Sequence, residues 1–211
     1  MTKIQTTNFL KFKTNNILMR YLFKRFFYTL GKLVTGKGYK EILDAGCGEG
    51  ETIARLEKIL PANIAGFDCN PECINYINQR FPQHQFTLQS IYELPYADNS
   101  FDLVFCCEVL EHLKFPERAL LELKRISKKN IILSVPHEPW FQMGNFLRGK
   151  YLRTWGNHPE HIQHWNPANF HKLLSEFFTK VEIHSSFPWI IADCCLEQVL
   201  TPSTVSYIRA Q

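Results

Sequence analysis

Residues 42–51 of this chain read ILDAGCGEGE, and the rest of the sequence is arranged around this segment. Two apolar residues end a predicted buried strand, glycines follow at positions 46, 48 and 50, and residues 52–60 then repeat apolar side chains at helical spacing. A strand that passes through glycines into a helix lets the backbone approach a ligand closely, with N–H groups directed at it. The segment therefore predicts a ligand-binding turn between a strand and a helix.

The carboxylates of this turn narrow the choice of ligand. A dinucleotide-binding turn has the pattern G-x-G-x-x-G, which would place its third glycine at position 51, where this chain has Glu51. Asp44, Glu49 and Glu51 close to a helix N-terminus would also repel a pyrophosphate. They suit a ligand with an ammonium group, a ribose and little negative charge. S-adenosylmethionine (SAM) is such a ligand.

Three ordered motifs resemble those of the class I SAM-dependent methyltransferases, in particular the type 11-like enzymes that act on small molecules. Residues 44–50 resemble motif I of that family, an acidic residue followed by x-G-x-G-x-G. The next predicted strand, residues 64–68, ends in Asp68, and residues 99–113 resemble the family's fourth strand and the helix after it. The resemblance covers about residues 41–190 and implies SAM as the cofactor.

The resemblance also implies which residues bind the cofactor. Asp44 would organise the glycine turn near the ammonium group, and Asp68 would hold the ribose hydroxyls. Ser90 stands where the family commonly has an acidic residue that meets the adenine amino group, and a serine hydroxyl can still accept that hydrogen bond. The residues expected to bind the cofactor are Asp44, Gly46, Cys47, Gly48, Gly50, Asp68, Cys69, Ser90, Ile91, Cys107 and Glu108.

Strands and helices alternate along the chain, which predicts an α/β fold. We expect a doubly wound, mostly parallel, seven-stranded, Rossmann-like sheet of the class I methyltransferase type, with an N-terminal lid helix. The pairs Asn70-Pro71 and Asn166-Pro167 each predict a helix start. The last two strands are predicted at residues 181–184 and 204–208. The predicted divisions are a basic helical arm, residues 1–40, and a SAM-binding domain, residues 41–211.

The N-terminal arm holds most of the positive charge. Residues 1–40 contain nine Lys and Arg and no Asp or Glu, which leaves 24 − 9 = 15 basic against 20 acidic residues in the rest of the chain. Residues 15–34 are predicted to form an amphipathic helix. This helix packs on the sheet edge as a lid over the cofactor or touches an anionic membrane surface, and a nucleic-acid-binding arm is a weaker third alternative because no aromatic-basic motif accompanies it. No apolar run reaches the roughly 18 residues of a transmembrane helix, and no secretory signal is recognisable.

The seven cysteines have no disulfide-framework spacing and are predicted to be free thiols in a reducing compartment. We therefore expect a cytoplasmic protein, with peripheral membrane association as an open alternative. The oligomeric state is not predicted.

Histidines on the substrate side are the candidate catalytic bases. They are His137, after the fifth strand, and His161 and His164, in the segment before the last large helix. An imidazole has an unperturbed pKa of about 6.5, which suits the deprotonation of a hydroxyl during methyl transfer. Histidines that only hydrogen-bond a loop are the alternative. The spacing of histidines at 158, 161 and 164 matches no zinc motif, so no metal is expected.

Several absences bear on the acceptor. Residues 106–109 read CCEV where amino-group nucleic-acid methyltransferases carry [DNS]-P-P-[YF], and the acidic body disfavours a phosphate backbone. The sequence therefore predicts methyl transfer to a small molecule, a sugar or a lipid-linked acceptor, most simply at oxygen. A catalytically silent partner or regulatory subunit with the same fold is the alternative, and a dinucleotide oxidoreductase is a weaker third hypothesis.

Overall fold

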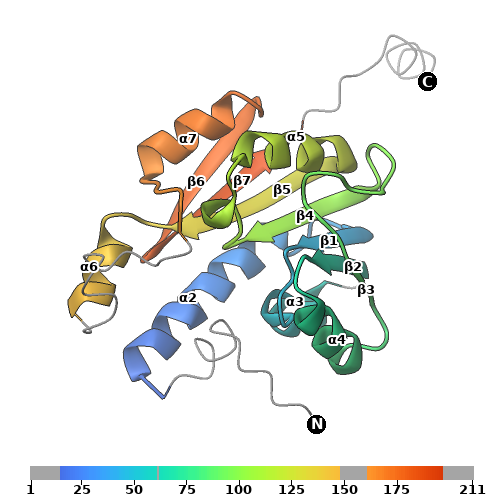
Figure 1. Ribbon diagram of the computed structural model, residues 1–211, viewed down its shortest axis with the longest axis horizontal. Coiled ribbons are helices and arrows are strands. Elements are labelled where there is room, and N and C mark those ends of the chain that lie inside the picture. The colour runs from blue at the N-terminus through green and yellow to red at the C-terminus, as the bar shows by residue number, and fades with distance from the viewer. Residues whose placement is uncertain (1–14, 61, 148–160, 197–211) are drawn as a thin grey trace.

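The computed structural model describes residues 15–60, 62–147 and 161–196, and of residues 144–147 it describes the backbone alone. One seven-stranded sheet lies between two layers of helices (Figure 1). The elements are α2 (Ile17–Val34), β1 (Glu41–Ala45), α3 (Glu51–Leu56), η1 (Glu57–Ile59), β2 (Asn63–Asp68), α4 (Pro71–Arg80), β3 (Gln85–Leu88), β4 (Phe101–Cys107), η2 (Leu110–His112), α5 (Pro116–Ile126), β5 (Ser127–Pro136), α6 (Trp140–Leu147), α7 (Pro167–Ser175), β6 (Lys180–Ser186) and β7 (Trp189–Cys195).

The sheet has the order β3-β2-β1-β4-β5-β7-β6, in which β7 alone runs antiparallel to its neighbours. The predicted doubly wound, mostly parallel, seven-stranded fold is confirmed. The strand order reverses between β1 and β4, and ligands of open α/β sheets bind beyond the carboxyl ends of the strands at such a switch point. The topology therefore places the turn after β1 beside the chain that leaves β4.

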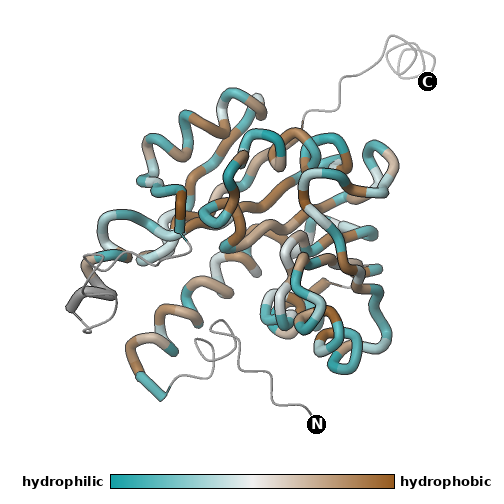
Figure 2. The backbone as a smooth tube through the Cα atoms, viewed as in Figure 1, coloured by the Kyte–Doolittle hydropathy of each residue, from teal (hydrophilic) through white to brown (hydrophobic). Residues whose placement is uncertain are grey.

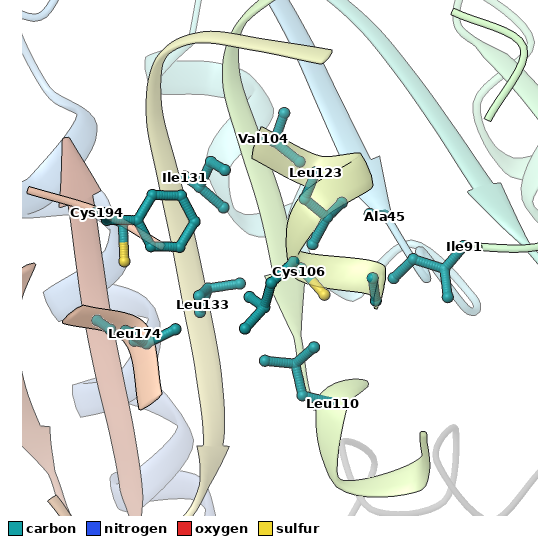
Figure 3. Packing of buried hydrophobic residues seen from close by; sticks show 14 of the residues in the cluster. Ala45, Ile91, Val104, Cys106, Leu110, Leu123, Ile131, Leu133, Leu174 and Cys194 are labelled. Atoms are coloured by element: carbon teal, nitrogen blue, oxygen red, sulfur yellow. The ribbon is translucent and has the colours of Figure 1, made fainter. Parts of the chain in front are cut away.

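Alternate side chains of the central strands enter two separate cores. Leu43, Val104 and Cys106 pack with α5 and α7 on one face, as the close view in Figure 3 shows for part of this cluster. Ile42 and Phe105 pack with α2, α3 and α4 on the other face. Because both faces are covered, these strands are mostly apolar, and the sheet appears as the hydrophobic centre of the tube in Figure 2.

Two of the helices begin as the sequence predicts. The side chain of Asn70 accepts a hydrogen bond from the backbone N–H of Glu72 at 2.9 Å, with Pro71 as the first helical residue of α4. Asn166 caps α7 in the same way and forms a capping box with Asn169. Each cap satisfies backbone donors that the first helical turn leaves unpaired.

The position of the seventh strand was predicted wrongly. The predicted segment, residues 204–208, lies outside the described residues, and the sheet is completed by β7 at Trp189–Cys195. β6 and β7 form an antiparallel hairpin in which Ser186 lies opposite Trp189, so that only Phe187 and Pro188 connect the two strands. This turn has none of the glycine or asparagine residues that usually mark a two-residue hairpin.

The predicted N-terminal helix is present as α2. Its buried residues, Phe23, Phe26, Phe27, Leu30 and Val34, pack in the same core as α3 and the inner strands. Phe23 and Phe26 place their ring centroids 5.1 and 5.2 Å from that of Trp189 in β7. The described part of the arm therefore contributes to the core of the fold. Among the described residues, no helix is long and apolar enough to cross a membrane.

Candidate functional site

The glycine turn after β1 combines two packed glycines with one open glycine. Gly46 and Gly50 both have positive φ, and a Cβ atom on Gly46 would overlap Val109, while one on Gly50 would lie 2.8 Å from Ile77 and from Phe81. Gly48 also has a positive φ, of 49°, but a Cβ atom there would meet nothing within 4 Å. The outer glycines therefore allow close packing, and Gly48 is the point at which a ligand can approach the backbone.

Asp68, at the end of β2, is tied to this turn. Its Oδ2 accepts a hydrogen bond from the backbone N–H of Gly48 at 2.9 Å, and its Oδ1 accepts one from Asn70 at 2.8 Å. Each carboxylate oxygen has a second lone pair, so the side chain keeps acceptor capacity for the hydroxyls of a ribose. The structure thus joins the predicted ribose residue to the predicted methionyl turn through a direct contact.

Two carboxylates of the turn are buried. Burial of a charged carboxylate costs free energy, and a nearby cation would offset that cost. Asp44 is 2% exposed and Glu49 is 3% exposed, and among the described residues Asp44 Oδ2 and Glu49 Oε1 have no hydrogen-bond partner. Burial and, secondly, the charge of Asp68 raise the pKa of Asp44 to about 7. The pKa of Glu49 is also raised, mainly by burial. A buried carboxylate is costly unless a cation joins it, so these residues fit the ammonium and sulfonium charges of SAM and do not fit a pyrophosphate.

The cysteines of the turn take no part as charged groups. Cys47 is buried, its N–H donates to the carbonyl oxygen of Phe67 at 2.9 Å, and burial raises the pKa of its thiol far above the usual range. Cys69 is exposed, and partial burial of its thiol together with the charge of Asp68 also raises its pKa. Thiols with raised pKa values stay neutral, which leaves backbone and packing contacts as their contribution.

The residues predicted for the adenine pocket follow β3. Ser90 is exposed, and its Oγ accepts a long hydrogen bond of 3.4 Å from Tyr92 N–H. Ile91 is buried and packs into the core with Leu94 and Val104, so its backbone is the part that remains available to a ligand. Ser90 is accordingly the side chain of this pair that is free to face the adenine edge.

The residue after β4, Glu108, is held by the protein itself. It has a positive φ of 58°, which is uncommon for a residue with a side chain. Its Oε1 accepts a hydrogen bond from Ser134 Oγ at 3.1 Å and its Oε2 accepts one from Trp189 Nε1 at 2.8 Å. Burial raises the pKa of neighbouring Cys107 well above its usual value. Glu108 therefore fixes the turn after β4 to β5 and β7, a role for its side chain that the sequence did not indicate.

Two of the three predicted histidine bases lie at the end of β5. A parallel bridge joins His137 to Trp165, and the N–H of Glu138 donates to the carbonyl oxygen of Trp165 at 2.8 Å. His164 Nδ1 lies 4.0 Å from the buried Glu138 Oε1. Burial raises the pKa of Glu138 and lowers that of His137. The structure thus brings two segments that are far apart in the sequence together at the edge where the cofactor turn lies.

The third predicted base, His161, has different neighbours. It is buried, and its ring centroid lies 5.0 Å from that of His112 in η2 and 5.7 Å from that of Phe141 in α6. Three possible metal-ligand atoms lie within 4.8 Å of one another, one each from Glu111, His112 and His161. His158, the first histidine of the predicted triplet, lies outside the described residues. His112 was not among the predicted bases, and no local spacing connects it to a residue about fifty positions later.

The aromatic residues of this region divide between packing and exposure. Trp165 is buried in the core against Phe170, whereas Trp140 is 45% exposed at the start of α6. Tyr151 and Trp155 lie outside the described residues.

Comparison with known proteins agrees with this geometry. A family model described as a methyltransferase domain matches residues 43–135, which include the glycine turn, Asp68 and the end of β4. An uncharacterized methyltransferase of Schizosaccharomyces pombe is 35% identical over 99 residues, which cover 41% of this chain and 36% of that protein. A probable S-adenosylmethionine-dependent methyltransferase of Mycolicibacterium smegmatis is 26% identical over 164 residues, 77% of this chain and 60% of that protein. The chain thus spans less than two thirds of the length of either relative.

A solved structure shares the fold over most of the chain. The magnesium protoporphyrin IX methyltransferase of Synechocystis PCC 6803 with bound SAH superposes with a TM-score of 0.65 at 17% sequence identity, covering 87% of this chain and 89% of that chain. At this identity the similarity concerns the fold alone.

Proposed function

Because this chain belongs to the class I SAM-dependent methyltransferase family, we propose that it transfers a methyl group from SAM to a hydroxyl oxygen of a small-molecule, sugar or lipid-linked acceptor. The cofactor supplies, when bound, a methyl group on a positively charged sulfur. The task left to the protein is to hold the acceptor in line and to accept its proton.

The glycine turn and the two strand ends beside it hold the cofactor in this proposal. Gly48 allows the backbone approach, Asp68 binds the ribose hydroxyls, and the buried Asp44 balances the ammonium charge. Ser90, after β3, supplies the hydroxyl for the adenine edge. These roles follow from the open space at Gly48 and from the buried acceptor atom of Asp44 described above.

The pair of His164 and Glu138 accepts the proton of the acceptor hydroxyl. A carboxylate at ion-pair distance from an imidazole, here 4.0 Å from Glu138 Oε1 to His164 Nδ1, stabilises the protonated ring that forms when the imidazole takes up a proton. The Glu138 carboxylate is itself held by the N–H of Gln142 at 3.0 Å. His164 is partly exposed, so an incoming acceptor can reach it, and Glu138 beneath it is buried. His137 would pack beside this pair with its imidazole neutral.

One observation carries the proposal. The glycine turn follows β1 and Glu138 follows β5, at the same edge of the sheet, and His164 lies beside Glu138. β4 pairs with both strands in parallel, so the two strand ends are two strand spacings apart, about 10 Å. An acceptor in front of β4 would lie between the sulfonium of the cofactor and the histidine pair. Strand order alone therefore separates cofactor and base by a span in which a reacting group fits.

The test is a two-stage measurement on the full chain. Calorimetric titration with SAM and with its demethylated product comes first. A radiolabelled methyl assay then screens hydroxylated small molecules, sugars, lipid extracts and, as a contrasting class, tRNA. We expect binding of both cofactor forms and a labelled product that is stable to base, as an ether is. A nitrogen-linked or RNA-linked product would overturn the acceptor assignment.

Two variants assign the base. His164→Ala should reduce turnover at least a hundredfold, in keeping with the contribution of a general base, and should leave SAM affinity unchanged. His171→Ala, which removes an exposed histidine on α7, is the matched control and should do neither. SAM binding without turnover on any acceptor class would instead favour the silent-subunit hypothesis.

A further inference from the structure

Glu111, His112 and His161 form a cluster that the proposed function does not use. Glu111 is 1% exposed, His161 is 5% exposed and His112 is partly exposed. Each of the three offers one ligand atom, and these atoms lie within 4.8 Å of one another. Two imidazole nitrogens and one carboxylate oxygen therefore lie close together, two of them on buried side chains and one on a partly exposed side chain.

The backbone fixes this convergence. The N–H groups of Ile162 and Gln163 both donate to the carbonyl oxygen of Glu111, at 2.9 and 3.1 Å, and the side-chain amide of Gln163 donates to the carbonyl oxygen of Leu113 at 3.2 Å. These three hydrogen bonds hold the segment of His161 against η2. The cluster is thus built by tertiary contacts on both of its segments and does not depend on chance proximity of long side chains.

We propose that Glu111, His112 and His161 bind a divalent transition-metal ion, with Zn²⁺ as the first candidate. Two histidines and one glutamate are a ligand set of catalytic zinc sites, in which the remaining coordination position is left for water or substrate. The same mixed nitrogen and oxygen set suits Mn²⁺ and Fe²⁺ and is a poor match for Mg²⁺ or Ca²⁺, which prefer oxygen ligands. Bonds of about 2.0–2.2 Å bring ligand atoms within roughly 3.5 Å of each other, so the side chains close by about 1 Å when the ion binds.

The position of the cluster gives the ion a use. η2 starts three residues beyond the end of β4, the strand between the cofactor turn and the histidine pair of the proposed function. A metal ion there would coordinate the acceptor hydroxyl, lower the pKa of its proton and orient the oxygen for in-line attack. The proton would pass to His164, the C–S bond would break as the O–C bond forms, and the sulfur would leave as a neutral thioether. This use of the ion rests on the proposed function, whereas binding of the ion rests on the cluster alone.

The sequence led us to expect no metal, because the histidines at 158, 161 and 164 were considered as one triplet. The fold separates this triplet. His164 lies beside Glu138, and His161 lies beside His112, a residue from another element. The ligand set therefore exists only in the folded chain.

The experiment measures the metal alone on the purified full chain. After treatment with a chelator and removal of the chelator, the protein is titrated with Zn²⁺ by calorimetry and with Co²⁺ by visible absorption, which reports the ligand geometry. We expect one ion per chain. His112→Ala and His161→Ala should each weaken binding at least tenfold, and Glu111→Gln should do the same.

Folding and specificity are controlled separately. SAM titration reports whether each variant is folded, and His112→Ala, at the most exposed ligand, is the variant least able to disturb the core. His171→Ala should bind the ion like the parent chain. Failure of the parent to bind Zn²⁺ and Co²⁺, or equal binding by His112→Ala and the parent, would overturn the proposal. Metal binding without methyl transfer would contradict the proposed function alone, and methyl transfer that survives metal removal would contradict the use given to the ion.

Discussion

The indole Nε1 of Trp189 donates a hydrogen bond to Oε2 of Glu108 at 2.8 Å, and this contact connects the last strand of the sheet to the turn after β4. On its other side, the Trp189 ring packs against Phe23 and Phe26 of α2. A helix at the N-terminal end of the described chain is thereby coupled through one side chain to the strand end that lies beside the glycine turn.

Replacing Trp189 by phenylalanine tests this coupling. Trp189→Phe keeps most of the ring packing but removes the donor to Glu108, and a hydrogen bond to a charged group contributes about 1.5–3 kcal/mol. We expect a loss of unfolding free energy in that range by denaturant titration, together with weaker SAM binding. Trp140→Phe, at a half-exposed indole in α6, is the matched control. An equal loss in both variants would mean that the hydrogen bond contributes nothing specific.

The three glycines of the turn should respond differently to alanine. The new methyl group of Gly48→Ala meets no neighbouring atom, so the only cost to stability is the positive φ, about 1–2 kcal/mol. The methyl group would, however, occupy the space through which we expect the cofactor to approach. Gly46→Ala adds an overlap with Val109 to a similar backbone cost. We therefore expect Gly48→Ala to lose SAM affinity with a small change in stability, and Gly46→Ala to lose stability more strongly. Calorimetry and denaturant unfolding separate the two, and the reverse order would contradict the assignment of Gly48 to the ligand side.

Asp44 predicts how the stability of the ligand-free protein depends on pH. Its pKa rises from 3.8 in the unfolded chain to about 7 in the fold, so the folded state binds more protons than the unfolded state between these values. Stability from this group is therefore complete below about pH 4 and is lost as the pH rises towards 7, by on the order of 4 kcal/mol.

Asp44→Asn should remove this dependence, make the ligand-free protein more stable than the parent at pH 8, and weaken SAM binding. Thermal unfolding at pH 5 and pH 8 gives the first result and calorimetry the second. Asp98→Asn, at an exposed aspartate paired with Arg125, is the control and should leave the pH dependence in place. If the stability of the parent relative to Asp44→Asn rises between pH 5 and pH 7, the role of Asp44 is refuted.

Asp68 is the residue on which cofactor affinity should depend most. Asp68→Ala removes the acceptor of the Gly48 N–H and the expected partner of the ribose, so SAM should bind at least tenfold more weakly, in line with about 1.5–3 kcal/mol for a charged hydrogen bond. The demethylated product, which has the same ribose, should lose affinity equally. Unchanged affinity in the titration would remove Asp68 from the site.

Local sequence predicted the elements whose signals are local. The β1 turn, the Asn-Pro caps of α4 and α7 and the apolar central strands follow from glycine spacing, capping and burial on both faces. β7 was missed because the Phe187-Pro188 turn lacks the usual hairpin residues and a short apolar run does not distinguish strand from helix. The contact of Trp189 with Glu108 and the grouping of His161 with Glu111 join residues far apart in the sequence, which no local pattern encodes.

We propose the exposed N-terminal end of α2 as the surface that contacts an anionic membrane. Ile17, Leu18 and Tyr21 are 83%, 63% and 56% exposed, and the basic residues Arg20 and Lys24 lie among them. In the following turns one face of the helix packs in the core, and the other face stays exposed. The first two turns carry the most exposed aliphatic side chains of the helix. We therefore propose them as the contact with anionic lipid, where apolar side chains can insert while the basic ones bind headgroups.

We expect the chain to cosediment with vesicles that contain anionic lipid at low salt and to be released at about 0.5 M salt, because screening shortens the range of the charge attraction. The double variant Ile17→Ser and Leu18→Ser should stay in the supernatant. Tyr28→Ser, at a residue that is 64% exposed farther along the same helix, should still sediment. If the parent fails to sediment at low salt, α2 serves the fold alone, since its buried face already accounts for its position against Trp189.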